Sequence, residues 1–138
     1  MLIRAIIADD HEEFRRRIYS ELAPQFDVVA VVESGEEALR EVKRLRPDVA
    51  VLDLNMGPLN GIDVIRTLVA EQTPVAIVVV SADADPLSAQ AALSSGAAAF
   101  VVKSRLSDDL KTAIERALRR VSFVSPGVLD GAPHSDRR

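Results

Sequence analysis

Residues 47–53 read Pro-Asp-Val-Ala-Val-Leu-Asp, and this stretch decides the fold because it joins a continuous apolar run to an acidic end. Residues 49–52 show no polar alternation, so both faces of the strand that they predict have to be covered. Similar runs recur along the chain at residues 2–8, 28–32, 75–80 and 98–102. Runs of this kind are typical of a parallel sheet with helices on both faces.

Apolar residues at helical spacing separate these runs. They are Phe14, Ile18 and Leu22; Leu39, Val42 and Leu45; Ile62, Ile65 and Leu68; and Leu110, Ile114, Ala117 and Val121. Residues 87–93 are alanine-rich, which also favours a helix. Asp10 with Glu13, and Ser34 with Glu37, have the spacing of helix capping boxes. Five repeats of strand and helix predict an α/β fold, a doubly wound, five-stranded parallel sheet with right-handed crossovers.

The composition narrows the classes of function. The chain has 138 residues and a formal net charge of −4, which disfavours direct binding to nucleic acid phosphates. It has no cysteine, and its two histidines, His11 and His134, are too few for a histidine metal cage. The apolar runs are shorter than the roughly 20 residues that cross a bilayer, so we expect no membrane span and a cytoplasmic location.

The length fits one domain. We expect the domain to cover residues 1–122, because the strand and helix pattern ends there. Residues 123–138 contain Pro126, Gly127, Gly131 and Pro133, which predicts a flexible tail or the start of a linker to an output domain outside this sequence.

Polar residues follow four of the predicted strands. Asp9 and Asp10 follow the first strand and Asp53 the third, while Ser81 ends the fourth and Lys103 follows the fifth. In open parallel sheets, ligands bind at the carboxyl ends of the strands, so these side chains should converge. Taken alone, each of these residues could have an ordinary structural role, as a helix cap, a turn residue or a solvated lysine. The whole set could also be a cluster of ion pairs with a purely structural role.

A divalent cation would relieve the repulsion between three neighbouring carboxylates. Oxygen ligands without histidine or cysteine suit Mg²⁺, with Asp10 and Asp53 as direct ligands and Asp9 acting through water. An ammonium group at Lys103 opposite the metal makes sense if a phosphoryl group lies between them. Asp53 then becomes the expected nucleophile.

At these positions the chain resembles the receiver domain of bacterial two-component response regulators. The resemblance covers residues 2–121. It lies in IIADD at residues 6–10, PDVAVLDLNM at residues 47–56 with Gly61 eight positions after Asp53, VVVSA at residues 78–82, and AAFVVK at residues 98–103.

The resemblance implies a flavodoxin-like (βα)5 fold with strand order 2-1-3-4-5. It makes Asp53 the phospho-acceptor, and Asp9 and Asp10 the acidic pair that holds Mg²⁺. Asn55 would give a backbone carbonyl to the metal, and Lys103 would bind the phosphoryl group. The donor would be a sensor histidine kinase or a phosphotransfer protein.

The resemblance also implies a conformational switch and residues that set the lifetime of the phosphorylated state. Ser81 stands where a hydroxyl moves toward the acylphosphate, and Phe100 stands where an aromatic ring turns inward. Ordinary packing at a strand edge is an equal reading for Phe100. Asn55 and Asp83 would tune the lifetime of the phosphorylated state.

Two junctions depart from the family pattern. Gly57 and not proline follows Met56, and Ser104 and not proline follows Lys103. The second departure and the late Ser125-Pro126 pair are more similar to receivers of the NarL/FixJ type.

Other surfaces and functions stay open. Residues 15–17 are three arginines, either a solvated helix face or a docking surface, and Val121, Phe123 and Val124 could form a homodimer seam or contact a missing domain. We do not expect an enzyme that turns over a separate substrate. One alternative is an aspartyl-phosphate-type phosphatase, but Asn55 stands where such an enzyme would have a second aspartate as general acid. The other alternative is an interaction module that is never phosphorylated.

Overall fold

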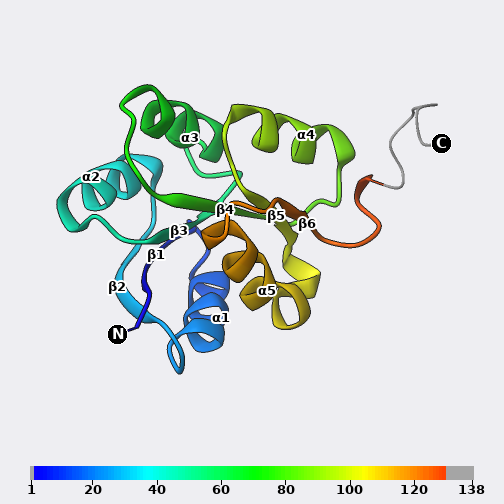
Figure 1. The fold of residues 1–138 in the computed structure, drawn as a ribbon, viewed down its shortest axis with the longest axis horizontal. Helices are drawn as coiled ribbons and strands as arrows, with labels where there is room; N and C mark the ends of the chain where they lie inside the picture. The colour runs from blue at the N-terminus through cyan, green and yellow to red at the C-terminus, as the bar shows by residue number, and fades with distance from the viewer. Residues whose placement is uncertain (1, 130–138) are drawn as a thin grey trace.

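The computed structural model describes residues 2–129, which form a parallel sheet between two layers of helices (Figure 1). The strands are β1 (Arg4–Ala8), β2 (Asp27–Val32), β3 (Val49–Asp53), β4 (Ala76–Ser81), β5 (Ala99–Val102) and β6 (Phe123–Val124). The helices are α1 (Glu12–Leu22), α2 (Gly35–Leu45), α3 (Gly61–Ala70), α4 (Pro86–Ser95) and α5 (Leu106–Leu118), with a 3₁₀ turn η1 (Lys103–Arg105) between β5 and α5.

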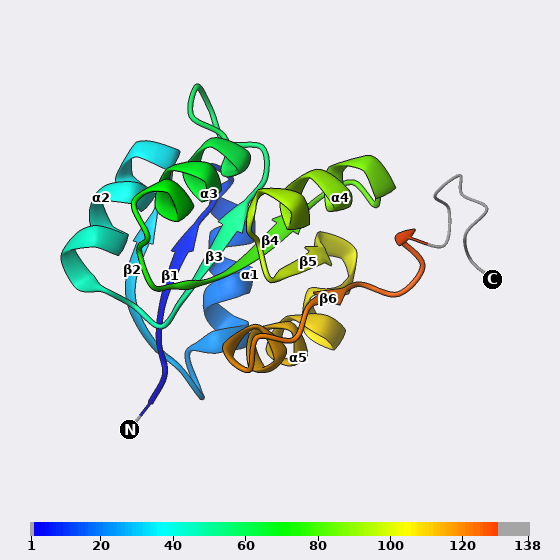
Figure 2. The ribbon, with the colours of Figure 1, turned by 45° about the horizontal axis from the view of Figure 1, so that its top comes forward.

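The strand order is β2-β1-β3-β4-β5-β6, and every neighbouring pair is parallel. This confirms the flavodoxin-like α/β fold and the order predicted for the first five strands. The sheet differs by its sixth strand, since five were expected. Phe123 and Val124 pair with Ala99 and Phe100 of β5. The expected tail therefore begins inside the sheet, where β6 covers an edge of β5 (Figure 2).

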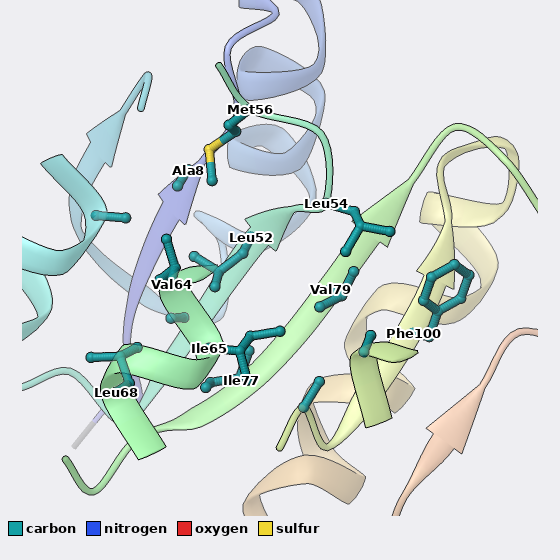
Figure 3. Packing of buried hydrophobic residues seen from close by; sticks show 14 of the residues in the cluster. Ala8, Leu52, Leu54, Met56, Val64, Ile65, Leu68, Ile77, Val79 and Phe100 are labelled. Carbon is teal, nitrogen blue, oxygen red and sulfur yellow. The ribbon is translucent and has the colours of Figure 1, made fainter. Parts of the chain in front are cut away.

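The helices lie on both faces of the sheet, as the unbroken apolar runs require. Helices α2, α3 and α4 cover one face, and α1 and α5 cover the other (Figure 1). Side chains of the first layer pack between α3 and the central strands, among them Leu52, Val64, Ile65 and Val79 (Figure 3). Gly61 lets α3 start close to the sheet, because a Cβ there would lie 2.8 Å from the carbonyl oxygen of Asp53.

The helix caps only partly follow the sequence pattern. Helix α1 begins after His11 and not after Asp10, and within residues 2–129 no side chain caps it, so the first predicted capping box is wrong. Ser34 does accept the N–H of Glu37, at 3.2 Å. The Glu37 carboxylate, however, accepts the N–H of Glu33 and not that of Ser34, so the second box is only half formed.

The chain changes course after α5. The helix ends at Leu118, so Val121 lies beyond it and is 48% exposed, against the prediction that it continues the helical stripe. Residues 130–138 of the predicted tail, with His134, lie outside the described residues. No helix within residues 2–129 is both long enough and apolar enough to cross a bilayer.

Candidate functional site

The carboxyl ends of four strands bring buried polar side chains to one edge of the sheet. Asp9 follows β1, Asp53 ends β3, Ser81 ends β4 and Lys103 follows β5. They are 0%, 1%, 1% and 3% exposed, respectively. Burial of a charged group is costly unless it is paired or serves a ligand. The four side chains therefore form a site whose location the sequence had predicted.

Lys103 joins the two buried carboxylates. Its Nζ lies 2.9 Å from Asp9 Oδ2 and 3.5 Å from Asp53 Oδ1. The Asp9 contact is an ion pair without the alignment of a hydrogen bond. The ammonium also lies 4.2 Å from the ring centroid of Phe14 on α1, a cation–π contact. The fold thus holds the Lys103 amine directly beside Asp53.

Asp53 combines one engaged and one free oxygen. Its Oδ1 accepts the N–H of Asn55 at 3.2 Å, whereas its buried Oδ2 has no hydrogen-bond partner among residues 2–129. Burial and then the negative charge of Asp9 raise the pKa of Asp53 to about 6, against the lowering effects of Lys103 and the Asn55 N–H. The carboxylate is therefore ionised at neutral pH, but less favourably than on a surface.

A cation would fit beside this free oxygen. Ligand atoms of Asp9, Asp10, His11 and Asp53 lie within 4.8 Å of one another. The donors are mainly carboxylate oxygens, and Asp53 Oδ2 is buried with nothing in the described chain to satisfy it. Such a donor set suits a cation that prefers oxygen ligands, such as Mg²⁺. The structure therefore brings the predicted acidic residues together in an arrangement compatible with a divalent ion.

His11 is a member of this cluster that the sequence interpretation did not include. Its Nδ1 lies 2.9 Å from Asp10 Oδ1 and 3.3 Å from Asp9 Oδ1. The available signal was its position directly after the acidic pair, but it had been considered only as part of a histidine cage. Asp9 and Asp10 also differ in exposure, because Asp9 is completely buried whereas the Asp10 side chain is 39% exposed.

Arg15 is a second residue whose local role the sequence did not indicate. Its Nη1 donates to the carbonyl oxygen of Asp9 at 2.8 Å and so ties α1 to the end of β1. Arg16 instead pairs with Glu12 on the exposed face of α1, and Arg17 lies over the Phe14 ring. The three arginines therefore do not form one uniform surface.

The remaining predicted residues surround the acidic edge at different depths. Ser81 Oγ accepts the N–H of Asp83 at 3.2 Å, and both Asp83 and Asn55 are exposed. Phe100 is fully buried in the layer of α2, α3 and α4. The sequence interpretation offered packing at a strand edge as one role for Phe100. Because β6 pairs with β5, Phe100 lies on an inner strand of the sheet and not at its edge.

The curated relatives of this chain include response regulators and a protein-glutamate methylesterase/protein-glutamine glutaminase of Geobacter sulfurreducens, which is 33% identical over 126 residues, covering 88% of this chain and 34% of that protein. The protein is 33% identical over 128 residues to the transcriptional regulatory protein DegU of Brevibacillus brevis, covering 91% of this chain and 54% of DegU. It is 28% identical over 131 residues to the response regulator protein VraR of Staphylococcus aureus, covering 94% of this chain and 63% of VraR. The chain thus spans less than two thirds of the length of these relatives.

Solved structures of response regulators also match this chain. The signal receiver domain of NarL from Mycobacterium tuberculosis matches with a TM-score of 0.81 and 28% identity, over 86% of this chain and 97% of that one. A LuxR-family two-component response regulator from Aurantimonas matches with a TM-score of 0.83 and 29% identity, over 94% of each chain. The family model of the response regulator receiver domain matches residues 5–115. The chain therefore belongs to the receiver domains of two-component response regulators, a family whose general function is to accept a phosphoryl group.

Proposed function

We propose that Asp53 accepts a phosphoryl group from a phosphohistidine on a sensor kinase or phosphotransfer protein. One observation carries this assignment: the buried Oδ2 of Asp53 makes no hydrogen bond within residues 2–129, and the ion pair of the same carboxylate with the Lys103 ammonium is made through Oδ1. Asp9 Oδ2 also lacks a hydrogen bond, but it is paired with Lys103 at 2.9 Å. A purely structural carboxylate would be expected to have both oxygens satisfied.

The transfer requires little of the protein beyond position and charge. An ionised Asp53 oxygen forms the new P–O bond while the P–N bond to the donor histidine breaks, so no proton has to leave the aspartate. Lys103 Nζ lies 3.5 Å from Asp53 Oδ1 and would bind an oxygen of the incoming group. Its pairing with Asp9 holds the ammonium inside the site before the donor arrives.

We assign the metal position to the carboxylates of Asp10 and Asp53 and the backbone carbonyl of Asn55, with Asp9 nearby. The unsatisfied Oδ2 of Asp53 and the grouping of the acidic ligand atoms support this assignment. When bound there, Mg²⁺ supplies charge neutralisation for the oxygens of the transferred group.

The response to phosphorylation would pass through Ser81 and Phe100. Ser81 Oγ, which now accepts the N–H of Asp83, would donate its hydroxyl proton to the new phosphoryl oxygen. Phe100 is already buried here, so its change would be a repacking and not an entry from solvent. We assign the tuning of the phosphorylated lifetime to the exposed Asn55 and Asp83. The N–H of Asn55 donates to Asp53 and that of Asp83 to Ser81.

We further propose a cytoplasmic protein that turns over no separate substrate and does not itself contact nucleic acid, in keeping with its net charge of −4. The proposed phosphoryl donor and partner is a sensor histidine kinase or a phosphotransfer protein. Phe123 and Val124 are half-buried against their own chain, which leaves the exposed Val121 as the remaining part of the expected dimer seam.

Intact-mass spectrometry tests the assignment. The protein is incubated with acetyl phosphate and Mg²⁺, alongside Asp53→Asn and the control Asp27→Asn, which alters an exposed aspartate at the start of β2. We expect one added phosphoryl group in the parent and in the control, and none in Asp53→Asn. Rapid release of phosphate over many turnovers from a generic phosphate monoester would instead indicate a phosphatase. An unchanged mass in all three would indicate an interaction module.

A further inference from the structure

A buried hydroxyl contacts the last residue of β5, which directly precedes Lys103. Ser125, in the segment that follows β6, is 1% exposed, and its Oγ accepts the N–H of Val102 at 3.1 Å. Its own N–H donates to the carbonyl oxygen of Phe100 at 2.9 Å. Ser125 therefore extends the β5–β6 pairing by one residue and fixes the last residue of β5. Lys103 is the next residue in the chain.

A buried carboxylate completes this contact. Ser125 Oγ donates to Asp109 Oδ2 at 2.7 Å, and Asp109 is 5% exposed. Arg105 donates to the same carboxylate through Nε, at 2.7 Å from Oδ2, and through Nη2, at 3.1 Å from Oδ1. Burial alone would raise the pKa of Asp109, but the hydrogen bonds from Arg105 and Ser125 hold it below its usual range. The Ser125–Asp109–Arg105 network therefore stays ionised and satisfied.

The network holds both ends of the turn that carries Lys103. The turn η1 comprises Lys103–Arg105. Before it, the N–H of Val102 is bound to Ser125; at its end, the Arg105 side chain is bound to Asp109. A fixed turn reduces the number of directions in which the Lys103 side chain can leave the backbone. Small displacements of a charged group in such a site have large effects on reaction rate.

We infer that Ser125 and Asp109 are positioning residues for Lys103, and that the segment after α5 is a working part of the phosphoryl site. This inference builds on the proposed role of Lys103 in binding the phosphoryl group. The segment is well anchored for the task, because Phe123 and Val124 pair with β5 and Val128 is 2% exposed.

One consequence concerns partners of this segment. A domain or protein that draws residues 123–128 away from β5 would remove Ser125 from Val102 and Asp109 and loosen the Lys103 turn. Coupling between two binding events is reciprocal, so phosphorylation of the acceptor would in turn change how readily the segment leaves β5. The physical link between the two is the single residue step from Val102 to Lys103.

The first test measures the position of Lys103 without phosphorylation. The chain contains three lysines, Lys43, Lys103 and Lys111, so acylation of each amine by an N-hydroxysuccinimide ester can be followed by peptide mass spectrometry. In the parent, Lys103 should react slowest, since it is 3% exposed and paired. Ser125→Ala and Asp109→Asn should raise its rate relative to the other two about fivefold, the equivalent of one hydrogen bond.

Two controls show whether the change in acylation rate is specific to Lys103. Ser107→Ala removes a hydroxyl of α5 that contacts Glu21 at the surface, and it should leave the ratio unchanged. A general loss of structure would accelerate Lys111 together with Lys103, because Lys111 lies in the middle of α5. An unchanged ratio in folded Ser125→Ala or folded Asp109→Asn overturns the inference.

The second test measures the initial rate of phosphorylation by acetyl phosphate with saturating Mg²⁺. Ser125→Ala and Asp109→Asn should be about fivefold slower than the parent, and Ser107→Ala equal to it. Lys103→Met distinguishes a failure of the proposed Lys103 role from a failure of the positioning role of Ser125 and Asp109. If Lys103→Met matches the parent, the proposed role of Lys103 is wrong. If Lys103→Met is slow while both network variants match the parent, the inference falls and the proposed function stands. Asp109→Asn keeps the test valid if Ser125→Ala does not fold.

Discussion

Two buried carboxylates in this protein, Asp53 and Asp109, have opposite surroundings. Asp53 is 1% exposed and keeps an oxygen without a hydrogen-bond partner among residues 2–129. Asp109 is 5% exposed and accepts from a serine hydroxyl and a guanidinium fork. Burial, helped by Asp9, raises the pKa of Asp53 to about 6, whereas hydrogen bonds overcome burial and lower the pKa of Asp109.

The difference shows how a buried charge indicates function. A carboxylate whose two oxygens both accept hydrogen bonds from the fold has little capacity left for a ligand, so Asp109 is suited to holding other groups in place. A carboxylate that the fold buries and leaves incomplete lowers stability, and such a residue is typical of a reactive site. We therefore propose that the same residue type serves chemistry at Asp53 and positioning at Asp109. The following changes test this distinction.

The largest effect on stability is expected from Asp109→Ala. The change leaves the Ser125 hydroxyl and the Arg105 guanidinium without their shared acceptor and opens a cavity. We expect the free energy of unfolding to fall by about 2–3 kcal/mol. Urea denaturation followed by circular dichroism measures it. A loss below about 0.5 kcal/mol would show that the network is not an important structural contact.

Asp53→Asn should act in the opposite direction. Because the folded-state pKa of Asp53 is raised to about 6, its proton stabilises the fold at low pH, and this contribution is lost as pH rises through that value. Replacing the carboxylate by a neutral amide should therefore stabilise the protein by about 1–2 kcal/mol at pH 7.5 without Mg²⁺.

The pH dependence provides the control for this prediction. Near pH 4, about the ordinary pKa of an aspartate, the stabilisation should nearly vanish. Asp27→Asn, at an exposed position, should show no such change. Urea denaturation of all three proteins at both pH values measures the difference. An Asp53→Asn variant that is less stable than the parent at pH 7.5 would contradict the electrostatic account.

Mg²⁺ should stabilise the parent by mass action. At a free concentration ten times the dissociation constant, the expected gain is about 1.4 kcal/mol, visible as a rise in Tm. Asp53→Asn and Asp10→Asn should lose most of this gain, while Asp109→Asn should keep it. A Tm of the parent that does not respond to millimolar Mg²⁺, or an equal response in Asp10→Asn, would count against the proposed metal position.

His11→Ala should have the smallest effect. The imidazole contacts Asp9 and Asp10, but its side chain is 63% exposed, so solvent screens both contacts. We expect a change of less than about 0.5 kcal/mol in the free energy of unfolding without metal. A loss above about 1 kcal/mol would mean that His11 holds the acidic cluster together and belongs with the positioning residues.

The sequence predicted the first five strands because each is a short apolar run. The expectation that every run is buried on both faces is wrong for β2, an edge strand that is only partly buried and whose Val31 is 42% exposed. It also placed Asp53, Ser81 and Lys103 at one edge, since a parallel sheet aligns the ends of its strands. The strand β6 was missed because Phe123–Val124 is too short to show a pattern, and its pairing with β5 is a long-range contact. The cap of α1 was misplaced because the Asp9 carboxylate accepts the N–H of His11.

The site's internal contacts were harder to predict than its location. Asp109 and Ser125 are 16 residues apart, and each looks like an ordinary polar residue in its own segment. Lys103 was expected to lie opposite a metal with a phosphoryl group between them, and its pairing with Asp9, at 2.9 Å, was not predicted. Such pairings depend on side-chain directions after packing, which spacing along the chain does not encode.

The most direct test of the central claim identifies the modified residue. The protein is phosphorylated with acetyl phosphate and Mg²⁺, and the acylphosphate is reduced with borohydride, which converts a phosphorylated aspartate to homoserine. Peptide mass spectrometry then locates the homoserine. We predict homoserine at position 53 alone. Homoserine at position 9 or 10, or a fully phosphorylated sample with an unmodified Asp53, would contradict the account.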